Sequence, residues 1–292
     1  MSEFLQQMVN GISLGSIYAL IALGYTMVYG IIKLINFAHG DVYMIGAYIG
    51  FAATTYAQLG FFPALIISMA ACAVLGVFVE RIAYKPLRNS SRIAVLITAI
   101  GVSLLMEYVM MFFVGAEVRS YPKLLSERVF EIGNVYIKAQ QLYIIATAII
   151  LMIVLQFIVH KTKTGKAMRA VSIDKDAAQL MGIKVDRTIS FTFAIGSAFA
   201  GAAGVLVGIY YNSIDPLMGI MPGLKAFVAA VFGGIGSIPG AMIGGLGIGI
   251  METLVSGYWN SMYRDAAVFA FLIIILILKP AGLLGKNTRE KV

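Results

Sequence analysis

Few side chains in this chain could do chemistry, and most of them stand in apolar surroundings. Six polar or charged residues lie within or beside long hydrophobic runs: Asn36, His39, Asp41, Glu107, Lys225 and Glu252. Ionisable groups at membrane depth are costly, so they are candidates for a transport pathway. For Glu107 and Glu252, contacts between helices or subunits are favoured over substrate binding, and Lys225 is compatible with an anchor at the end of a span.

The sequence contains none of the constellations that enzymes use. No His and Cys residues have metal-site spacing, and no nucleophile, base and orienting acid occur together. No G-x-x-x-x-G-K-[ST] loop is present to bind the phosphates of ATP. We therefore predict that this chain is not an enzyme, holds no metal or cofactor, and leaves any ATP hydrolysis to another chain.

The first candidate hinge is a short polar break that holds Asn36, His39, Gly40 and Asp41. One interpretation makes His39 and Asp41 a polar hinge or lining near the cytoplasmic mouth of a pathway. The alternative, which the pattern favours, is a helix start capped by Asn36, with His39 and Asp41 at the membrane interface.

The second candidate hinge interrupts an apolar run too long for one helix, residues 223–259. Its members are small or helix-breaking residues: Gly233, Gly234, Gly236, Ser237, Pro239 and Gly240. Irregular backbone at membrane depth survives only where protein or water satisfies it, and paired breaks point to a transport pathway. Backbone groups around Ser237 could meet a zwitterion, but a tightly packed kink explains the same residues equally well.

The elements that must position these residues are membrane spans. Hydrophobic residues make up 60% of the 292 residues and charged residues 12%, about half the charged fraction of a soluble domain. Runs of spanning or half-spanning length occupy residues 8–29, 42–57, 62–83, 93–114, 141–159, 189–211, 223–259 and 266–278. We expect an all-α polytopic protein with about 8–9 membrane passes, including a broken or re-entrant helix, in one domain over residues 1–292.

Small residues and a single cysteine indicate how these spans pack. Gly196, Gly201 and Gly204 lie in the run 189–211 and are of the kind that lets helices approach closely. Cys72 is the only cysteine and lies inside an apolar run, so no disulfide is expected and its thiol should serve packing.

The distribution of Lys and Arg predicts the orientation. Residues 81–92 hold 4 of these residues, residues 161–187 hold 7 and the tail from Lys279 holds 4, together 15 of 22. By the positive-inside rule these segments face the cytoplasm, and the mixed loop 115–140 faces outward. Counting the broken helix then gives nine passes and an N-terminus outside. The net charge of +8 reflects these loops and does not indicate nucleic-acid binding.

The longest charged insert, residues 165–188, alternates apolar and charged positions in a way that predicts two short helices. Ser172 or Asp174 could cap the second helix, and Gly182 suits the left-handed residue that ends it. The insert is either a solvated loop or a surface for another protein to bind.

A weak internal repeat is also visible. Residues 39–47 resemble residues 238–245 at an offset of 198, and Lys-Pro pairs follow at 85–86 and 279–280. A repeat in which both halves enter the membrane, break at a Gly-rich turn and end on a Lys-Pro pair inside would explain the match, as would chance similarity in low-complexity Gly/Ala/Ile sequence.

Within the insert, Asp176, Ala177, Ala178 and Gly182 match the EAA-x-x-x-G motif of ABC importer permeases, with Asp in place of Glu. Three further blocks carry a wider resemblance: GYTMVYG at 24–30, INFAHGD at 35–41 and KAFVAAVFGGIGSIPGA at 225–241. Together with KPAGLLG at 279–285 they resemble the permease of the branched-chain amino-acid ABC importer, the LivH-type family, nearly from end to end.

This resemblance implies a permease subunit in a bacterial plasma (inner) membrane. It implies partners: a second, related permease, two cytoplasmic ATP-binding subunits and an external substrate-binding protein. Loop 160–188 would then carry the cytoplasmic coupling helix, and loop 115–140 would be external. Relatives that import urea or short amides share much of the pattern. An ion-coupled secondary transporter, using Asp41, Glu107 or Glu252, and a channel are the other classes left open, but neither needs a coupling motif.

Overall fold

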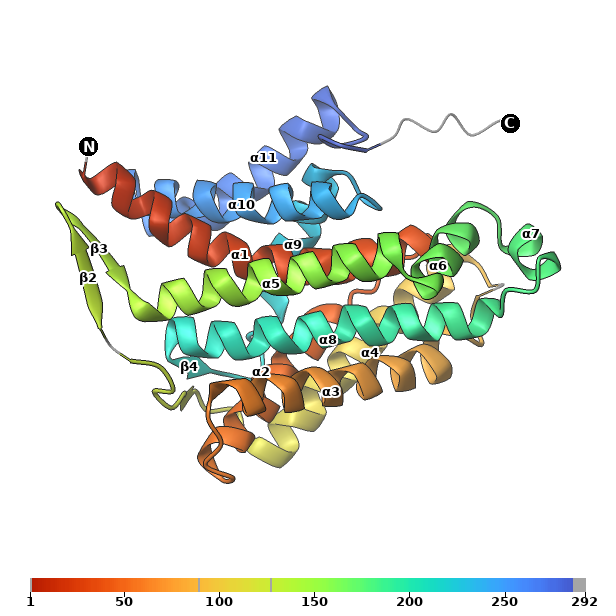
Figure 1. Cartoon of the computed structure of the whole chain (residues 1–292), viewed down its shortest axis with the longest axis horizontal. Helices are drawn as coiled ribbons and strands as arrows, with labels where there is room; N and C mark the ends of the chain where they lie inside the picture. The colour runs from red at the N-terminus through yellow and green to blue at the C-terminus, as the bar shows by residue number, and fades with distance from the viewer. Residues whose placement is uncertain (1, 89, 127, 286–292) are drawn as a thin grey trace.

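The computed structural model describes residues 2–88, 90–126 and 128–285, and most of them are helical (Figure 1). The helices are α1 (Ser2–Ile32), α2 (His39–Thr55), α3 (Phe61–Val79), continued by the π-helical turn η1 (Glu80–Tyr84), α4 (Arg92–Val114), α5 (Ala139–Lys161), α6 (Lys163–Ile173), α7 (Lys175–Leu180), α8 (Val185–Tyr211), α9 (Ile220–Gly233), α10 (Ile238–Tyr258), the 3₁₀ turn η2 (Ser261–Tyr263) and α11 (Arg264–Leu278).

Among the described residues, seven helices are long and apolar enough to cross a membrane. They are α1, α3 with η1, α4, α5, α8, α10 and α11 with η2. The helix α9, of 14 residues, is a shorter apolar helix, and α2 has 17 residues. The all-α polytopic fold predicted from composition is therefore confirmed, and the run 223–259 is broken into α9 and α10.

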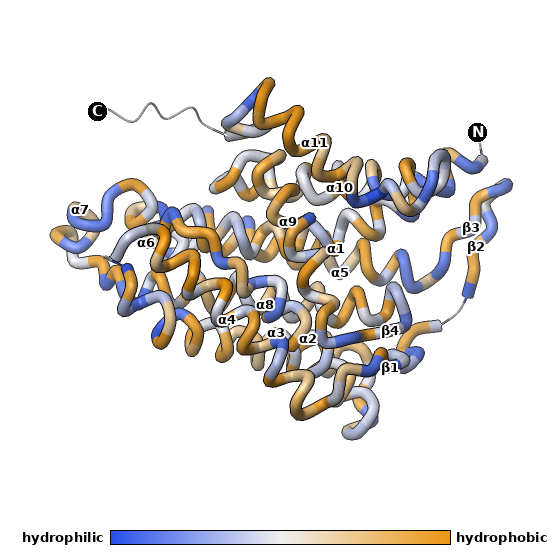
Figure 2. The backbone as a smooth tube through the Cα atoms, turned by 180° about the vertical axis from the view of Figure 1, so that it is seen from behind, coloured by the Kyte–Doolittle hydropathy of each residue, from blue (hydrophilic) through white to orange (hydrophobic). Residues whose placement is uncertain are grey.

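Polar segments gather at the two ends of the helical body. One end carries the N-terminus and the β2–β3 hairpin (Val129–Ile132 and Val135–Lys138), and the other carries α6 and α7 (Figure 1). Hydrophobic residues dominate the length between these ends (Figure 2). The positive-inside rule predicts that the α6–α7 end is cytoplasmic and the opposite end external, and the two ends are named by this prediction below. Lys286, Arg289 and Lys291, three of the tail residues behind this prediction, lie outside the described residues.

The core is built around α1 and α8. In each, 89% of the apolar window is buried, against 6% in α11, so α1 and α8 are shielded by the other helices. The glycines of α8 allow close contact, as the sequence predicted: a Cβ at Gly201 would lie 2.8 Å from the Ser68 carbonyl oxygen. Cys72 is fully buried and packs in this region, as expected.

The half-helices α2 and α9 begin side by side in the middle of the bundle. A Cβ at Gly40 would lie 2.5 Å from the carbonyl oxygen of Gly219, and the converse distance is also 2.5 Å. From this contact α2 runs to the outer end, where Gly50 faces Tyr121, and α9 runs to the cytoplasmic end, where Gly236 approaches Gly30.

The packing of the helices supports an inverted repeat but corrects its register. α1 packs along α10 as α8 packs along α3, and α2 lies on α3 and α8 as α9 lies on α10 and α1. If α1, α2 and α3 are exchanged with α8, α9 and α10 in that order, each of these helix pairs becomes another pair that is also in contact. The offset of 198 instead aligns α2 with α10, so that alignment is wrong: the Met-Ile-Gly match reflects similar small-residue packing at two helix starts.

The external loops contain the only strands in the described part of the chain. β1 (Arg119–Ser120) pairs with β4 (Ser213–Ile214), which ties loop 115–140 to the segment after α8. The β2–β3 hairpin is held to α1 because Gln6 exchanges two hydrogen bonds with the backbone of Tyr136, at 2.9 and 2.8 Å.

Candidate functional site

The cytoplasmic insert folds as the two short helices α6 and α7. Asp174 caps α7: its Oδ1 accepts hydrogen bonds from the backbone N–H of Asp176 at 2.9 Å and of Ala177 at 3.0 Å. Gly182 has φ +83° and ends the segment in the left-handed conformation. Of the two caps considered from sequence, Asp174 is the one used, because Ser172 bonds back to the Arg169 carbonyl.

The tip of this insert exposes an unusual amount of apolar surface. Ile173, Leu180 and Met181 are 87%, 88% and 83% exposed, whereas Ala178 is buried against the insert itself. Asp176 and Ala177 are also exposed. Large aliphatic side chains so completely open to water, together in one polar segment, indicate a surface that another protein covers.

The insert is fastened firmly to the membrane helices. Thr162 caps α6 by accepting from the Gly165 N–H at 3.0 Å, and Arg169 donates to the Val159 carbonyl. Met168 and Val171, which are part of α6, are buried. A side chain at position 165 would collide with the Val159 carbonyl, so a glycine is required at this corner. These contacts join α6 to the end of α5.

The first break does not have the cap that the sequence suggested. The residue before α2 is Ala38, which makes no side-chain capping bond. The Asn36 side chain instead accepts a 2.7 Å hydrogen bond from the hydroxyl of Tyr84, in η1. The predicted Asn36 cap is thus wrong, because burial beside Tyr84 gives this amide a partner from another element.

His39 and Asp41 are buried in the protein, not placed at the interface as the favoured interpretation had it. The His39 ring lies 4.8 Å from the Tyr25 ring, centroid to centroid, and its Nε2 has no partner among the described residues. Asp41 accepts from Ser103 of α4 and faces the carboxyl group of Glu107. Gly40 lies between them at the contact with α9, so the break positions polar groups at the centre of the bundle.

The second break is a packed turn. Ser237 caps α10 by accepting from the Gly240 N–H at 3.2 Å, and Pro239 occupies the first turn of that helix. Gly233 and Gly240 pack backbone to backbone, and Gly234 and Gly236 have φ values of +102° and +93°.

The segment after α11 covers this turn. The N–H of Leu284 donates to Gly233 at 3.0 Å and that of Leu283 to Phe232 at 2.8 Å. Of the two explanations given for the glycines, the geometry agrees with the tightly packed kink.

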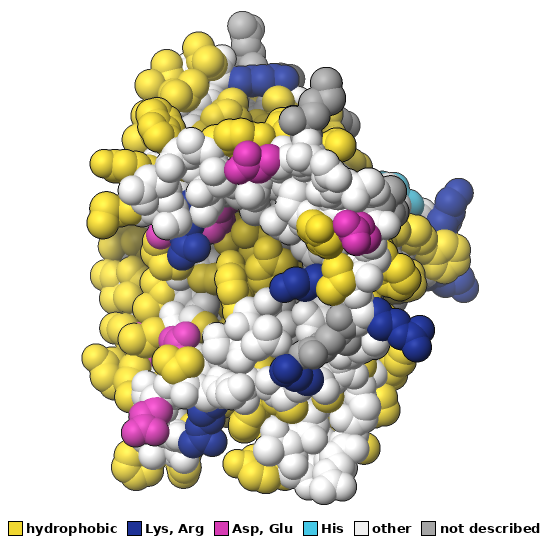
Figure 3. Space-filling model, turned by 90° about the vertical axis from the view of Figure 1, so that its left-hand side faces the viewer, with side chains coloured by type: hydrophobic (Ala, Val, Ile, Leu, Met, Phe, Trp, Pro, Cys, Tyr) yellow, Lys and Arg dark blue, Asp and Glu magenta, His cyan; other side chains and the backbone are white. Residues whose placement is uncertain are grey.

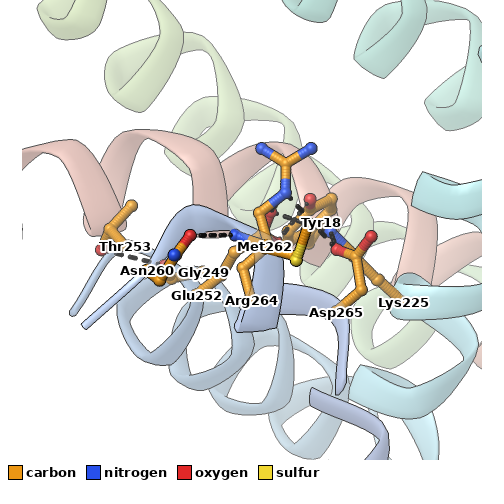
Figure 4. A network of polar contacts seen from close by, with 9 residues as sticks. All are labelled: Tyr18, Lys225, Gly249, Glu252, Thr253, Asn260, Met262, Arg264 and Asp265. Atoms are coloured by element: carbon orange, nitrogen blue, oxygen red, sulfur yellow. Dashed lines mark hydrogen bonds and ion pairs between the residues drawn. The ribbon is translucent and has the colours of Figure 1, made fainter. Parts of the chain in front are cut away.

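A third polar cluster lies in the outer half of the bundle, between α1, α9, α10 and α11 (Figure 4). Lys225 contacts Glu252 at 2.8 Å and Asp265 at 2.6 Å, and the Tyr18 hydroxyl donates to Glu252 at 2.8 Å. Arg264 lies 3.8 Å from Glu252. Because Lys225 is buried in these ion pairs, it is not the span-end anchor considered from sequence. Glu252 is a contact between helices, as favoured.

This cluster borders a cavity of about 220 Å³. The cavity is lined by residues from several segments: Tyr18, Tyr43, Tyr211, Ser213, Asp215, Met218, Met221, Pro222, Lys225, Glu252, Arg264 and Asp265. Sequence reasoning missed Arg264 and Asp265. Their position was the available signal. The two residues directly precede the last apolar run, at the end that the distribution of Lys and Arg predicts to be external.

Comparison with known proteins identifies the family. A family model described as "Branched-chain amino acid transport system / permease component" matches residues 7–278. The chain belongs to this permease family. It is 45% identical to the high-affinity branched-chain amino acid transport system permease protein LivH of Salmonella typhimurium, covering 99% of this chain and 98% of that protein. It is 42% identical to BraD of Pseudomonas aeruginosa, at 99% and 98% coverage.

A solved structure supports the fold of this permease. PsaBC from Streptococcus pneumoniae, in complex with Fab, matches with a TM-score of 0.50 over 95% of this chain and 92% of that chain, at 14% identity. That likeness concerns the fold alone. Together, the family and the apolar helices make this permease a multi-pass transport protein of the plasma membrane.

Proposed function

We propose that this permease is the membrane subunit of an ATP-driven importer of branched-chain amino acids. It forms the translocation pathway with a second permease, receives substrate from an external binding protein, and couples to a separate ATPase through Asp176, Ala177, Ala178 and Gly182. The full-length relatives, which are branched-chain amino acid permeases by name, support the substrate class. They do not favour a urea permease or a secondary transporter.

The observation that supports the coupling role is an exposed apolar tip whose backbone is held in place at both ends. Leu180 and Met181 contact almost nothing in this chain, yet Asp174 and Gly182 fix the backbone that presents them. A docking helix needs this combination, because its apolar side chains must enter a groove on the partner without first being ordered. A solvated loop has no need of it.

The test is to replace Leu180 with Asp in the complete transporter. Because Leu180 is 88% exposed, the change leaves the permease fold intact but places a carboxylate in the proposed docking groove. We expect co-purification of the ATPase and ATP-driven leucine uptake in proteoliposomes to fall at least about tenfold, a loss of ~1.4 kcal/mol in docking.

Two further variants sharpen the result. Phe130→Asp makes the same chemical change at an exposed apolar residue on the external hairpin and should leave ATPase binding unchanged. Gly182→Asp strains a left-handed position and should reproduce the effect of Leu180→Asp. Retention of both the ATPase and uptake in Leu180→Asp would show that α7 is not the coupling helix.

A further inference from the structure

The charged cluster of Lys225, Glu252, Arg264 and Asp265 is balanced in charge, with two cations and two anions. Lys225 and Glu252 are almost fully buried, whereas the side chains of Arg264 and Asp265 are 46% and 34% exposed. Burying such a network costs desolvation energy that an apolar contact would avoid. Its position beside a cavity, on the side from which substrate arrives, suggests that the cost serves binding.

The cluster leaves unused binding capacity on its exposed side. Figure 4 shows the Arg264 guanidinium above the ion pairs, with its two terminal nitrogens turned away from Lys225. No hydrogen bond joins these nitrogens to a described residue. The guanidinium faces Glu252 and Asp265 through its Nε, at 3.8 and 3.5 Å, which leaves the two terminal nitrogens for a carboxylate. Asp265 uses Oδ1 for Lys225 and Arg264, which leaves its other oxygen for an ammonium group.

The rest of the cavity lining is mixed: Ser213 and Asp215 are polar, and an apolar part lies beside them. Met218, Met221 and Pro222 line it next to the ring of Tyr43, which is fully buried. A volume of about 220 Å³ lies below the ~300–1,000 Å³ of pockets for drug-sized ligands, and suits a small solute. The outer end of the molecule is hollowed near its centre, with basic and acidic side chains beside a hydrophobic floor (Figure 3).

We propose that this cavity is an entry site for an amino-acid zwitterion with an aliphatic side chain. Arg264 binds the α-carboxylate, Asp265 binds the α-ammonium group, and Met218 and Met221 contact the side chain. The four-residue cluster favours a ligand that carries both charges, because a lone anion would leave Asp265 without a new partner and a lone cation would leave Arg264 without one. The proposal rests on the proposed function and adds where the solute is first held after its release from the binding protein.

The experiment measures binding to the permease pair in nanodiscs without the binding protein. Saturation-transfer NMR gives dissociation constants for L-leucine, for 4-methylpentanoate, which lacks the ammonium group, and for 3-methylbutylamine, which lacks the carboxylate. Leucine should bind roughly tenfold more tightly than either analogue, as expected for one charge-assisted hydrogen bond. Arg264→Gln should remove the preference over the amine, and Asp265→Asn the preference over the acid.

Arg128→Gln is the matched control, since Arg128 is exposed on the external loop and away from the cavity. The site is wrong if leucine binds no better than its analogues, or if Arg264→Gln and Asp265→Asn bind leucine as the unaltered permease does. ATP-driven leucine uptake by the unaltered complex is measured in parallel. If the unaltered complex shows no ATP-driven leucine uptake, the proposed function is overturned. The dissociation constants test the proposed site independently of that result.

Discussion

Lys225 has two carboxylate partners, one on α10 and one on α11, and its ammonium group lies 6.0 Å from the centre of the Tyr18 ring. Lys225 and these three groups lie on four different helices, so the cluster links α1, α9, α10 and α11. In water such pairs contribute little, but burial removes the competing solvent and makes each partner necessary to the others. Loss of one charge therefore costs more than the pair contributes.

Lys225→Met should destabilise the permease by about 3–5 kcal/mol, because buried Glu252 loses its close counter-charge at 2.8 Å and keeps only the half-exposed Arg264 at 3.8 Å. Lys225→Met combined with Glu252→Gln should recover most of that loss, since no buried charge is then left alone. Thermal unfolding of the purified proteins in one detergent measures both. Equal destabilisation of the single and double variants would contradict this account.

At the scale of elements, two short helices start at one crossing point. Gly40 and Gly219 approach so closely that neither position has room for a Cβ. Full-length helices would not meet head to head in this way, and the non-helical segments 33–38 and 212–219 lead into the two short helices. The breaks therefore bring the starts of α2 and α9 together within the helical bundle.

Gly40→Val should lower the stability by about 1–3 kcal/mol, because its side chain overpacks the crossing. Gly101→Ala, in α4, is the matched control: no atom lies within 4 Å of the added Cβ, and a helical alanine is favoured over glycine by about 0.5–1 kcal/mol. The yield of monodisperse protein and the unfolding temperature compare the two. A Gly40→Val protein as stable as the parent would argue against this crossing.

At the scale of the whole molecule, antiparallel helices place the β2–β3 hairpin and the α6–α7 insert at opposite ends (Figure 1). The basic residues decide which end is inside. Residues 161–187 carry seven Lys and Arg, and such a loop remains on the cytoplasmic side. Because α1 and α8 are buried inside the bundle, α4 and α11 lie on its outside, with only 22% and 6% of their apolar windows buried.

Single cysteines test this orientation in a Cys72→Ala background. Phe130→Cys should react with a membrane-impermeant maleimide on intact spheroplasts, and Leu180→Cys only in inverted vesicles, because both side chains are exposed at opposite ends. Labelling of both from the same side would rule out the proposed topology.

Much of this fold can be predicted from the sequence. Hydrophobic run lengths predicted the spans, and the glycine-rich stretch 233–240 predicted the turn between α9 and α10. Asp174 and Gly182 predicted the ends of α7. These features depend on neighbours within a few residues, where propensity and capping decide the structure. For the same reason the coupling segment could be located in advance, although its role stays a prediction.

Other features depend on contacts between segments far apart in the chain. The Asn36 side chain accepts a hydrogen bond from Tyr84 instead of capping α2. Gly219 contacts Gly40 because the two halves of the chain pack against each other. Lys225 finds Glu252 at a separation of 27 residues and Asp265 at 40. The amino-acid pattern was enough to predict a polytopic permease with a broken helix in residues 223–259. Which polar groups share a site depends on the packing of distant segments, because buried charges must be neutralised by whatever that packing brings within reach.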